Sequence, residues 1–327
     1  MNHGKGDWRD ESDERPASLP VRVPGAFQAL IDGAAGSPAA RALSLQVYPS
    51  SDEDRAREGD LADPLGEARF LVSDRLVHQY HNRVLLLTTG TCLGYCRYCF
   101  RRGFTAREAG FIGDDELSCV IDYLRRTPNV REILVSGGDP LSAGEDRLVG
   151  LLQAIRLARP DILIRLCTRA NVFAPELFSP SLVAFLRTLR PLWVIPHVNH
   201  PAELGPAQLA SFRGLIDSGI PIQSQTVLLR GINDQASVLA ELFHRLTLEG
   251  IKPGYLFQCD LARGVSSYRV PLSQGLALWR ELRHLLSGLS LPEYAVDLPG
   301  GGGKFPLSVL ALSDSIESTN TNGYISI

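Results

Sequence analysis

The sequence predicts an α/β protein folded as a partial barrel of six strand–helix units, a (β/α)6 arrangement. Six short apolar runs alternate with six segments of helical period along most of the chain. This alternation is typical of parallel strands joined by helices. No glycine-rich nucleotide-binding fingerprint follows the first strand, which favours an open or partial barrel over a doubly wound sheet. In such a barrel, functional side chains lie just after the strands.

The individual elements follow in a regular order. The predicted strands are Val84–Leu87, Ile133–Val135, Ile162–Leu166, Leu192–Ile195, Ile222–Leu229 and Tyr255–Phe257. The predicted helices are Asp115–Arg126, Glu145–Ala158, Ser181–Leu189, Pro206–Ser218, Gln235–Glu249 and Leu272–Leu286. We therefore expect a barrel over residues 83–290, with an N-terminal extension (1–82) and a C-terminal segment (291–327). Within the extension, residues 1–20 read as disordered because they are charged and aperiodic, whereas Phe27–Ala35 has a helical pattern.

Charge and hydropathy exclude several classes of protein. The 327 residues carry a net charge of −3, so the chain lacks the basic face that phosphate contacts with nucleic acid require. No apolar run approaches the roughly 18 residues of a membrane helix, and Met1–Arg15 has no signal-peptide core. We expect a cytoplasmic protein without nucleic-acid or membrane partners. Thiols stay reduced in that compartment, so the six cysteines are not a disulfide framework.

Three of those cysteines form a compact motif directly after the first predicted strand. Cys92, Cys96 and Cys99 have C-x3-C-x2-C spacing, which lets three thiolates on one loop bind three irons of a 4Fe-4S cluster. Since no fourth cysteine lies nearby, one iron stays open to another ligand. Zinc is the alternative, but structural zinc takes four ligands in paired spacings, and a second pair is missing. Four histidines are the candidates for a fourth zinc ligand: His78, His81, His197 and His200.

A glycine-containing loop follows the second predicted strand and reads Ser136-Gly137-Gly138-Asp139. Glycine lets the backbone approach a ligand closely, and the Asp139 carboxylate can take up an ammonium group. Taken alone, the same residues are also typical of an ordinary turn between a strand and a helix.

The second specific feature is the run of four glycines before Lys304. A phosphate-binding loop would need glycine at 298 and Ser or Thr at 305, but the chain has Leu298 and Phe305. Four glycines cost chain entropy, which suggests close backbone packing or loop mobility around the lysine. A lysine amine forms Schiff bases with aldehydes, and pyridoxal phosphate is the usual protein-bound aldehyde. The alternative for Lys304 is a surface charge.

In this order and at these separations, the motifs resemble the lysine 2,3-aminomutase family of radical S-adenosylmethionine enzymes. The stretches that carry the resemblance are Tyr80–Arg83, Cys92–Arg102, Ser136–Pro140, His197–Pro201, Gln225–Asp234, Gln258–Asp260 and Pro299–Lys304. The resemblance implies an isomerase with the partial barrel of radical S-adenosylmethionine enzymes. It also implies three cofactors: a 4Fe-4S cluster on the three cysteines, S-adenosylmethionine on the open iron, and pyridoxal 5′-phosphate.

The resemblance further assigns cofactor contacts. Lys304 matches the lysine that carries pyridoxal phosphate, and Tyr80 and Arg83 match residues that contact it. Gln79 stands where some members have a further arginine. Tyr98 matches a residue beside the adenine of S-adenosylmethionine. The remaining matches are Ser136, Gly137, Gly138 and Asp139, in the loop for the amino group of its methionine part, and Gln225 and His200, in the cofactor cleft.

The resemblance also assigns a substrate. Arg101 matches an arginine that binds the substrate carboxylate, and Asp260 and Asp297 match two acids that bind a distal ammonium. The implied substrate is L-lysine and the implied product is β-lysine, with arginine as the alternative substrate. The product would be either free β-lysine or a supply for modification of elongation factor P, and the electron donor a flavodoxin or ferredoxin. A homo-oligomer is left open.

Two rival interpretations remain at the level of the sequence. One is a radical S-adenosylmethionine enzyme without pyridoxal phosphate that acts on RNA or a peptide. The other is a metal-binding interaction module without catalytic activity.

Overall fold

The structure is a computed structural model, and it describes residues 18–55, 57–107 and 109–311. Most of the segment predicted to be disordered, and part of the predicted C-terminal segment, lie outside these residues. At the end of that predicted segment, Leu19 is buried, and the carbonyl groups of Leu19 and Pro20 accept hydrogen bonds from Arg97. These two residues therefore pack against the cysteine loop.

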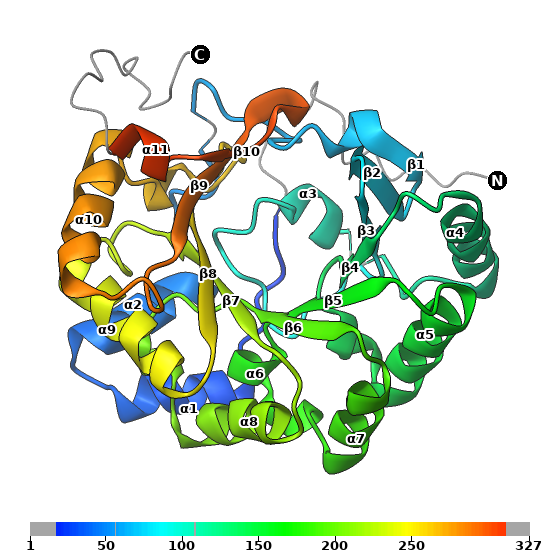
Figure 1. Cartoon of the computed structure of the whole chain (residues 1–327). Coiled ribbons are helices and arrows are strands. Elements are labelled where there is room, and N and C mark those ends of the chain that lie inside the picture. The colour runs from blue at the N-terminus through cyan, green and yellow to red at the C-terminus, as the bar shows by residue number, and fades with distance from the viewer. Residues whose placement is uncertain (1–17, 56, 108, 312–327) are drawn as a thin grey trace.

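All six predicted strands and all six predicted helices are present, with shifts only at their ends. The strands are β3 (Arg83–Leu87), β4 (Glu132–Ser136), β5 (Leu163–Thr168), β6 (Leu192–Pro196), β7 (Gln223–Leu228) and β8 (Lys252–Gln258). The helices are α4 (Asp114–Arg126), α5 (Glu145–Ala158), α7 (Pro180–Thr188), α8 (Pro206–Asp217), α9 (Ala236–Leu248) and α10 (Leu272–Leu285). Figure 1 shows the strands curving around a central space with these helices outside them.

The strands form two parallel blocks that meet in the middle of the arc. β3, β4, β5 and β6 pair in parallel, as do β7, β8 and β9 (Glu293–Leu298). Isolated bridges from Val194 to Ile222 and from His197 to Gln225 connect β6 with β7. The α/β partial barrel predicted from the sequence is thus confirmed.

Antiparallel strands extend both edges of this arc. β1 (Leu71–Ser73) and β2 (Leu76–Tyr80) continue it beyond β3, and β10 (Gly303–Pro306) pairs with β9 at the other edge. These strands lie outside the predicted barrel limits of 83–290 yet continue its sheets. The hairpin β9–β10 was not predicted, because its turn is the glycine run itself.

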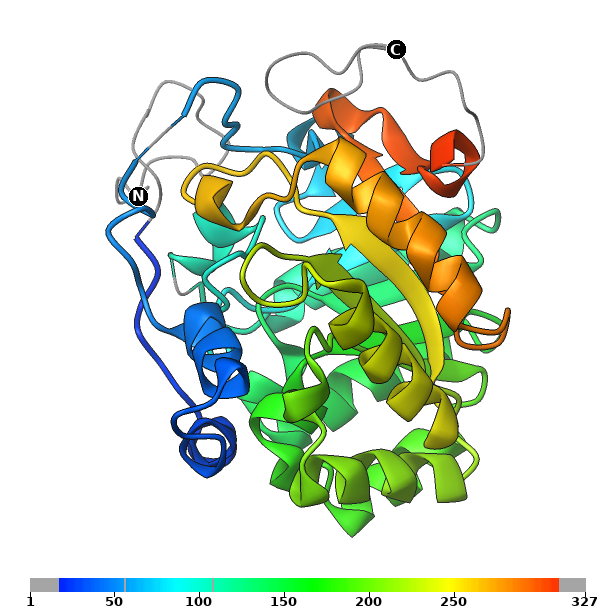
Figure 2. The same ribbon diagram turned by 90° about the vertical axis from the view of Figure 1, so that its left-hand side faces the viewer.

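Alternation of side chains along the strands produces both the core and an inner wall. In β5, Ile164, Leu166 and Thr168 are buried, and the intervening residues are only partly covered. Ile164 and Leu166 belong to the hydrophobic core shared with helices such as α5, which buries Leu148, Leu152 and Ile155 at helical spacing. The other set faces the interior of the barrel and is available to line a site. Figure 2 shows the yellow and orange helices lying along the outside of the strands in the same way.

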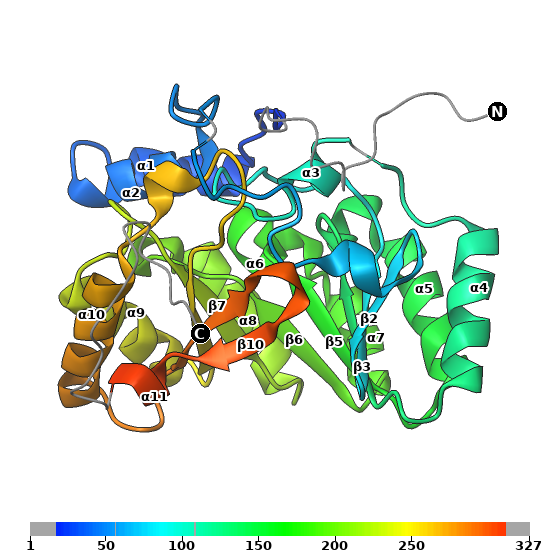
Figure 3. The ribbon, with the colours of Figure 1, turned by 90° about the horizontal axis from the view of Figure 1, so that it is seen from above.

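The N-terminal extension covers the end of the barrel at which the cysteine loop lies. Its helices α1 (Gly25–Gly33) and α2 (Pro38–Val47) lie at the same end as α3 (Arg102–Thr105) in Figure 3. Arg22 donates to the carbonyl of Cys92 at 2.9 Å, and the Arg97 amide donates to Gln46 at the same distance. The predicted helix at Phe27–Ala35 is confirmed as α1.

The remaining short elements connect these parts. They are α6 (Ala170–Phe173), α11 (Ser308–Ala311), η1 (Glu67–Phe70), η2 (Pro140–Ala143), η3 (Pro175–Leu177), η4 (Pro201–Glu203), η5 (Ser266–Tyr268) and η6 (Pro299–Gly301). No helix in the described ranges is both long and apolar enough to cross a membrane.

The two edges of the open barrel meet where the glycine run contacts the N-terminal extension. Gly66 has φ +66°, and a Cβ there would lie 2.6 Å from both the Gly300 carbonyl carbon and the Gly301 nitrogen. Arg69 donates to the Gly300 carbonyl at 3.0 Å, and Gln79 donates to the Gly301 carbonyl at 3.1 Å. The sequence suggested two reasons for the glycine run before Lys304, close backbone packing or loop mobility. These contacts show close backbone packing.

Candidate active site

A cavity of about 500 Å³ occupies the interior of the barrel and collects nearly all of the predicted site residues. Its volume is typical of ligand-binding pockets. The predicted residues that line it are Tyr80, Arg83, Cys92, Cys96, Tyr98, Cys99, Arg101, Ser136, Gly137, Gly138, Asp139, Gln225, Asp260, Asp297 and Lys304. They are as far apart in the sequence as Tyr80 and Lys304, so the barrel is what brings them together.

His200 is the exception, and the structure corrects its predicted position. Its Nδ1 accepts a hydrogen bond from the Ala202 amide at 3.1 Å, so the ring caps the short helix η4, and His200 does not line the cavity. His197 lines the cavity instead. It directly follows β6, so the rule that site residues follow strands favours His197. Burial lowers the pKa of His197 to about 3, so the ring is neutral.

The three cysteines lie on the loop between β3 and α3 and line the same cavity. Burial raises the pKa of the Cys99 thiol to about 11, and Cys96 acts in the same direction. Burial also raises the pKa of Cys92 well above its usual value, as do Cys99, Asp139 and Cys96. Thiolates crowded together in a dry site need a positive counter-charge, and metal-bound thiols are deprotonated outright.

The donor set fits a cluster in chemical terms. Across the described ranges, no three histidine, cysteine, aspartate or glutamate side chains are arranged to hold a metal ion as they stand. A cubane places each thiolate on a different iron and contributes its own sulfides. Three cysteines on one loop, all lining one cavity, match that requirement. Of the four histidines considered as zinc ligands, His197 shares the cavity with them.

A buried arginine that the sequence did not single out contacts this loop. Arg169 follows β5 directly, and its Nη1 donates to Cys96 Sγ at 2.9 Å. Its Nη2 lies 3.1 Å from the fully buried carboxylate of Glu203. Hydrogen bonds of this kind orient the ligands of a metal centre, so Arg169 is part of the site. The sequence could have indicated Arg169 by its position directly after a predicted strand, where functional side chains of a barrel lie.

The glycine loop after β4 packs against the strand end that leads into the cysteine loop. A Cβ on Gly138 would lie 2.1 Å from the Thr91 carbonyl oxygen, and one on Gly137 would lie 2.7 Å from that of Thr89. Glycine at both positions therefore allows the two loops to touch. The buried Asp139 carboxylate accepts hydrogen bonds from within the chain, from Leu141 N, Thr168 Oγ1 and Arg169 N at 2.8–3.0 Å.

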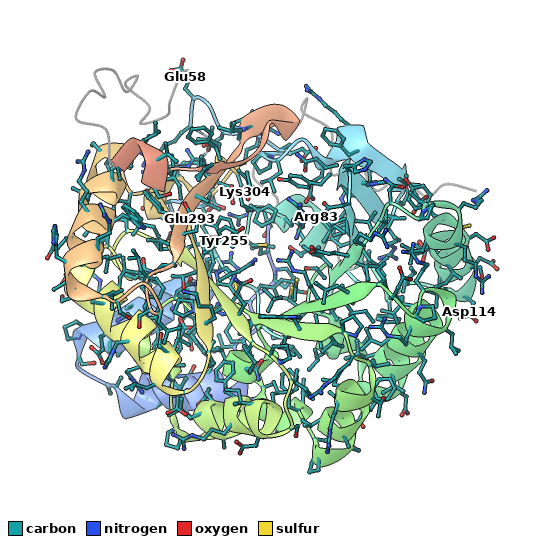
Figure 4. All side chains as sticks on the ribbon, in the orientation of Figure 1. Glu58, Arg83, Asp114, Tyr255, Glu293 and Lys304 are labelled. Atoms are coloured by element: carbon teal, nitrogen blue, oxygen red, sulfur yellow. The ribbon has the colours of Figure 1, made fainter. Side chains whose placement is uncertain are left out.

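Lys304 projects from β10 opposite Asp297 of β9. Its Nζ lies 3.1 Å from both carboxylate oxygens of Asp297 and 3.9 Å from the centre of the Phe257 ring. Burial lowers the pKa of Lys304, and Asp297 partly opposes this shift. A lowered pKa makes the neutral, nucleophilic amine more accessible, which is what Schiff-base chemistry requires. Figure 4 shows Lys304, Tyr255 and Arg83 around the central space.

Tyr80 and Arg83 continue this surface from β2 and β3. The Tyr80 hydroxyl accepts a hydrogen bond from the Lys304 backbone amide at 3.0 Å. The Arg83 guanidinium lies over the Tyr80 ring, 3.6 Å from its centre. Arg165 of β5 also lines the cavity, and its Nη1 lies 3.3 Å from the Glu132 carboxylate. An amine with a lowered pKa, aromatic rings and arginines in one cavity fit a phosphorylated aromatic aldehyde such as pyridoxal phosphate.

The predicted acid pair lines the same cavity. Asp260 follows β8 and Asp297 belongs to the adjacent β9. Burial raises the pKa of Asp260 to about 7, and the charge of Asp297 acts in the same direction. Two carboxylates in one partly dry site attract a cation, which relieves their repulsion.

Arg101 has a partner that the sequence did not reveal. Glu67 of η1 is 5% exposed and lines the cavity, and its carboxylate accepts hydrogen bonds from Arg101 Nε at 3.0 Å and from Nη2. Nothing in the sequence indicated Glu67, because it lies in an extension without a recognisable period or motif.

Curated proteins similar to this chain include several aminomutases. "Putative L-lysine 2,3-aminomutase" of Treponema pallidum is 53% identical over 96% of this chain and 89% of its own length. "L-lysine 2,3-aminomutase" of Fusobacterium nucleatum is 38% identical over 81% of this chain and 62% of its own. "Glutamate 2,3-aminomutase" of Clostridioides difficile is 31% identical over 81% of this chain and 63% of its own. The chain thus spans less than two thirds of the length of the latter two relatives.

Other comparisons are less informative. No family model matches the chain. A solved structure described as "Native anSMEcpe with bound AdoMet" has a TM-score of 0.49 and 15% identity, covering 61% of this chain and 58% of that one. A similarity this low adds nothing to the assignment.

Proposed function

Since the chain belongs to the lysine 2,3-aminomutase family of radical S-adenosylmethionine enzymes, whose members are isomerases, we propose that it moves the α-amino group of L-lysine to the β-carbon. The observation that carries this proposal is the shared cavity. The three cysteines, Lys304 and the acid pair, far apart in the sequence, all line it. The cysteines that would hold the radical source and a lysine whose pKa is lowered by burial therefore line one substrate-sized space.

Bound cofactors supply the reactive groups: the cluster with S-adenosylmethionine provides a carbon radical, and pyridoxal phosphate provides a carbonyl that carries the migrating nitrogen. Cys92, Cys96 and Cys99 would hold the cluster. The wall of the cavity near His197, Tyr98 and the glycine loop would hold S-adenosylmethionine. Lys304 would hold pyridoxal phosphate, with Tyr80 and Arg83 beside it.

The chain's own residues would place the amino acid. Arg101 offers a guanidinium fork that matches the geometry of a carboxylate. Asp260 and Asp297 offer negative charge to the distal ammonium, which otherwise would lose its proton in a dry site. The apolar faces of Phe257 and Tyr255 exclude water around Lys304, which limits side reactions of a radical.

The acid pair supports a cationic substrate over an acidic one. Glutamate would place a second carboxylate beside two aspartates, and like charges in a low-dielectric site repel one another. Arginine shares the positive charge of lysine and therefore remains the alternative substrate.

The test is an anaerobic incubation of the reconstituted full chain with pyridoxal phosphate, S-adenosylmethionine, a reductant and L-lysine. Parallel reactions contain L-arginine or L-glutamate. We expect β-lysine from L-lysine alone. Formation of deoxyadenosine without any β-amino acid would contradict the aminomutase proposal and favour a radical enzyme of another kind. Reduced flavodoxin and ferredoxin, offered separately as the reductant, test the proposed electron donors.

The fate of the product is a further part of the proposal. A cytoplasmic enzyme of this kind would supply either free β-lysine or β-lysine for modification of elongation factor P. Deletion of the gene distinguishes the two, because loss of a β-lysyl mass on elongation factor P is expected only for the second role.

A further inference from the structure

Glu67 and Arg101 form a largely buried ion pair in which only one edge of the guanidinium is used. Nε and Nη2 of Arg101 both donate to the Glu67 carboxylate. A guanidinium has a second edge, made by its two Nη atoms, that can bind another carboxylate in the same bidentate way. Over the described ranges, Glu67 is the only hydrogen-bond acceptor for the Arg101 side chain. The second edge is therefore unused, although Arg101 lines the cavity.

The position of Glu67 is built into the extension. Gly66, in the left-handed conformation at φ +66°, turns the chain against the Gly300–Gly301 backbone. The Asp63 carboxylate then accepts hydrogen bonds from the Glu67 and Ala68 amides at 3.0 and 2.8 Å. The Gly66 turn and the Asp63 carboxylate thus fix the backbone of Glu67. The Glu67 side chain then lines the cavity, close to the contact between the two barrel edges.

An arginine needs such a partner to serve as a fixed binding group. Its long side chain has several rotatable bonds, and a displacement of about 1 Å at a substrate-positioning group costs on the order of 100-fold in rate. Besides Glu67, Arg101 contacts the Phe100 ring, with the guanidinium carbon 4.5 Å from the ring centre. The charges of Arg101 and Glu67 also both act on Asp260, so the pair lies beside the proposed ammonium site.

We propose that Glu67 is a positioning residue: it fixes one edge of Arg101 so that the other edge binds the α-carboxylate of the amino-acid substrate. The inference rests on the proposed function, and it assigns to the N-terminal extension a direct part in substrate recognition. Without Glu67, Arg101 loses its fixed orientation toward the substrate carboxylate.

The experiment compares binding of L-lysine with that of L-lysinamide, which lacks the carboxylate. The full chain, loaded anaerobically with cluster and pyridoxal phosphate and without reductant, is titrated with each compound while the absorbance of bound pyridoxal phosphate is followed. The variants are Glu67→Gln, Glu67→Asp and the matched control Glu249→Gln. Glu249 forms the same kind of bidentate pair with Arg213, at 2.6 and 2.7 Å, but neither residue lines the cavity.

We expect Glu67→Gln to raise the Kd for L-lysine about tenfold and to leave that for L-lysinamide unchanged. Glu67→Asp, which keeps the charge on a shorter side chain, should fall between wild type and Glu67→Gln. Glu249→Gln should resemble wild type with both compounds. Equal iron and pyridoxal content in all variants confirms that they are folded, and Glu67→Asp carries the test if Glu67→Gln does not fold.

Three outcomes would overturn the inference. Unchanged L-lysine binding would show that Arg101 needs no partner, and tighter binding would show that Glu67 competes with the substrate. An equal loss for both compounds would show a general structural role. A wild-type protein whose absorbance does not respond to L-lysine would instead overturn the proposed function itself, so the two failures are distinguishable.

Discussion

Lys304 and Asp297 face each other across the β9–β10 hairpin, with the Lys304 Nζ 3.1 Å from both carboxylate oxygens of Asp297. Burial lowers the pKa of the lysine, and the aspartate raises it. The ion pair therefore fixes the position of the amine, and the lowered pKa still lets the amine lose its proton more easily than an exposed lysine does. Asp297 thus contacts the lysine that we assign to cofactor binding, and it is also one of the two acids that we propose for the recognition of a cationic substrate.

Replacement of that lysine gives the first prediction. Lys304→Ala should retain the cluster absorbance, because the cysteine loop is on another part of the barrel, and should lose turnover of L-lysine. The measurement is borohydride reduction followed by peptide mass spectrometry. The chain has three lysines, Lys5, Lys252 and Lys304, so the modified position is readily identified.

Lys252→Ala is the matched control, since Lys252 donates to carbonyl groups such as that of Leu289 at 2.7 Å and does not line the cavity. It should keep a reducible pyridoxal adduct on the 304 peptide. An adduct that persists in Lys304→Ala would contradict the assignment of Lys304.

The cysteine motif gives the second prediction. Cys99→Ser should abolish most of the bound iron and the visible absorbance of the reconstituted protein, because a cluster with two thiolate ligands is not retained. Cys119→Ser is the control, as Cys119 is exposed on α4. Iron content is measured chemically after anaerobic reconstitution. Wild-type iron content in Cys99→Ser would show that this cysteine is not a ligand.

The raised pKa of Asp260 gives the third prediction, on pH. With a pKa of about 7, Asp260 gains its negative charge as pH rises through neutrality. Binding of L-lysine should therefore tighten between about pH 6 and about pH 8, while the substrate ammonium stays protonated. Asp260→Asn should bind L-lysine weakly and lose this part of the pH dependence. The KM for L-lysine across this range is the measurement, and a flat profile in wild type would argue against the role of Asp260.

Whereas substrate binding should tighten as pH rises, the contribution of Asp260 to the stability of the fold should fall. Between its ordinary pKa near 4 and its raised pKa near 7, Asp260 binds more proton in the folded state than in the unfolded state. Its contribution to stability is thus present at low pH and is lost as pH rises through that window. Asp260→Asn should melt at a higher temperature than wild type at about pH 8 and close to wild type at about pH 4. The reverse order at pH 8 would show that the carboxylate is stabilised where it lies.

The seam between the barrel edges gives the fourth prediction. Gly66→Ala adds a Cβ 2.6 Å from the backbone of Gly300 and Gly301, in addition to straining a left-handed residue. Gly36→Ala is the matched control, because Gly36 has φ +77° with nothing within 4 Å. We expect Gly36→Ala to lower the free energy of unfolding by about 1 kcal/mol and Gly66→Ala by about 2–4 kcal/mol. Denaturant unfolding measures both.

Gly66→Ala should also weaken pyridoxal phosphate binding, because the displaced glycine run carries Lys304, whereas Gly36→Ala should not. If the two variants lost the same amount of stability and both kept full cofactor binding, the contact between Gly66 and Gly300–Gly301 would contribute neither to stability nor to cofactor binding.

The sequence by itself was sufficient for the repeating part of the fold and for the reactive groups. Alternation of apolar runs and helical segments is a local property, and it located the strands from β3 to β8 and the helices between them. The spacing of Cys92, Cys96 and Cys99 is equally local, since one short loop carries all three. The resemblance then named residues that, apart from His200, line one cavity.

The tertiary structure decided which partners those residues have. Arg101 pairs with Glu67, Lys304 with Asp297 and Tyr80, and the glycine run with Gly66 and Arg69. Most of these contacts join segments that are remote in the sequence, as with the 231 positions that separate Arg69 from Gly300. No local period or propensity encodes such a pairing, because it arises only when the two edges of the barrel are brought together. The tertiary structure also decided between His197 and His200. The two histidines are only three positions apart, yet His197 lines the cavity and His200 caps the next short helix.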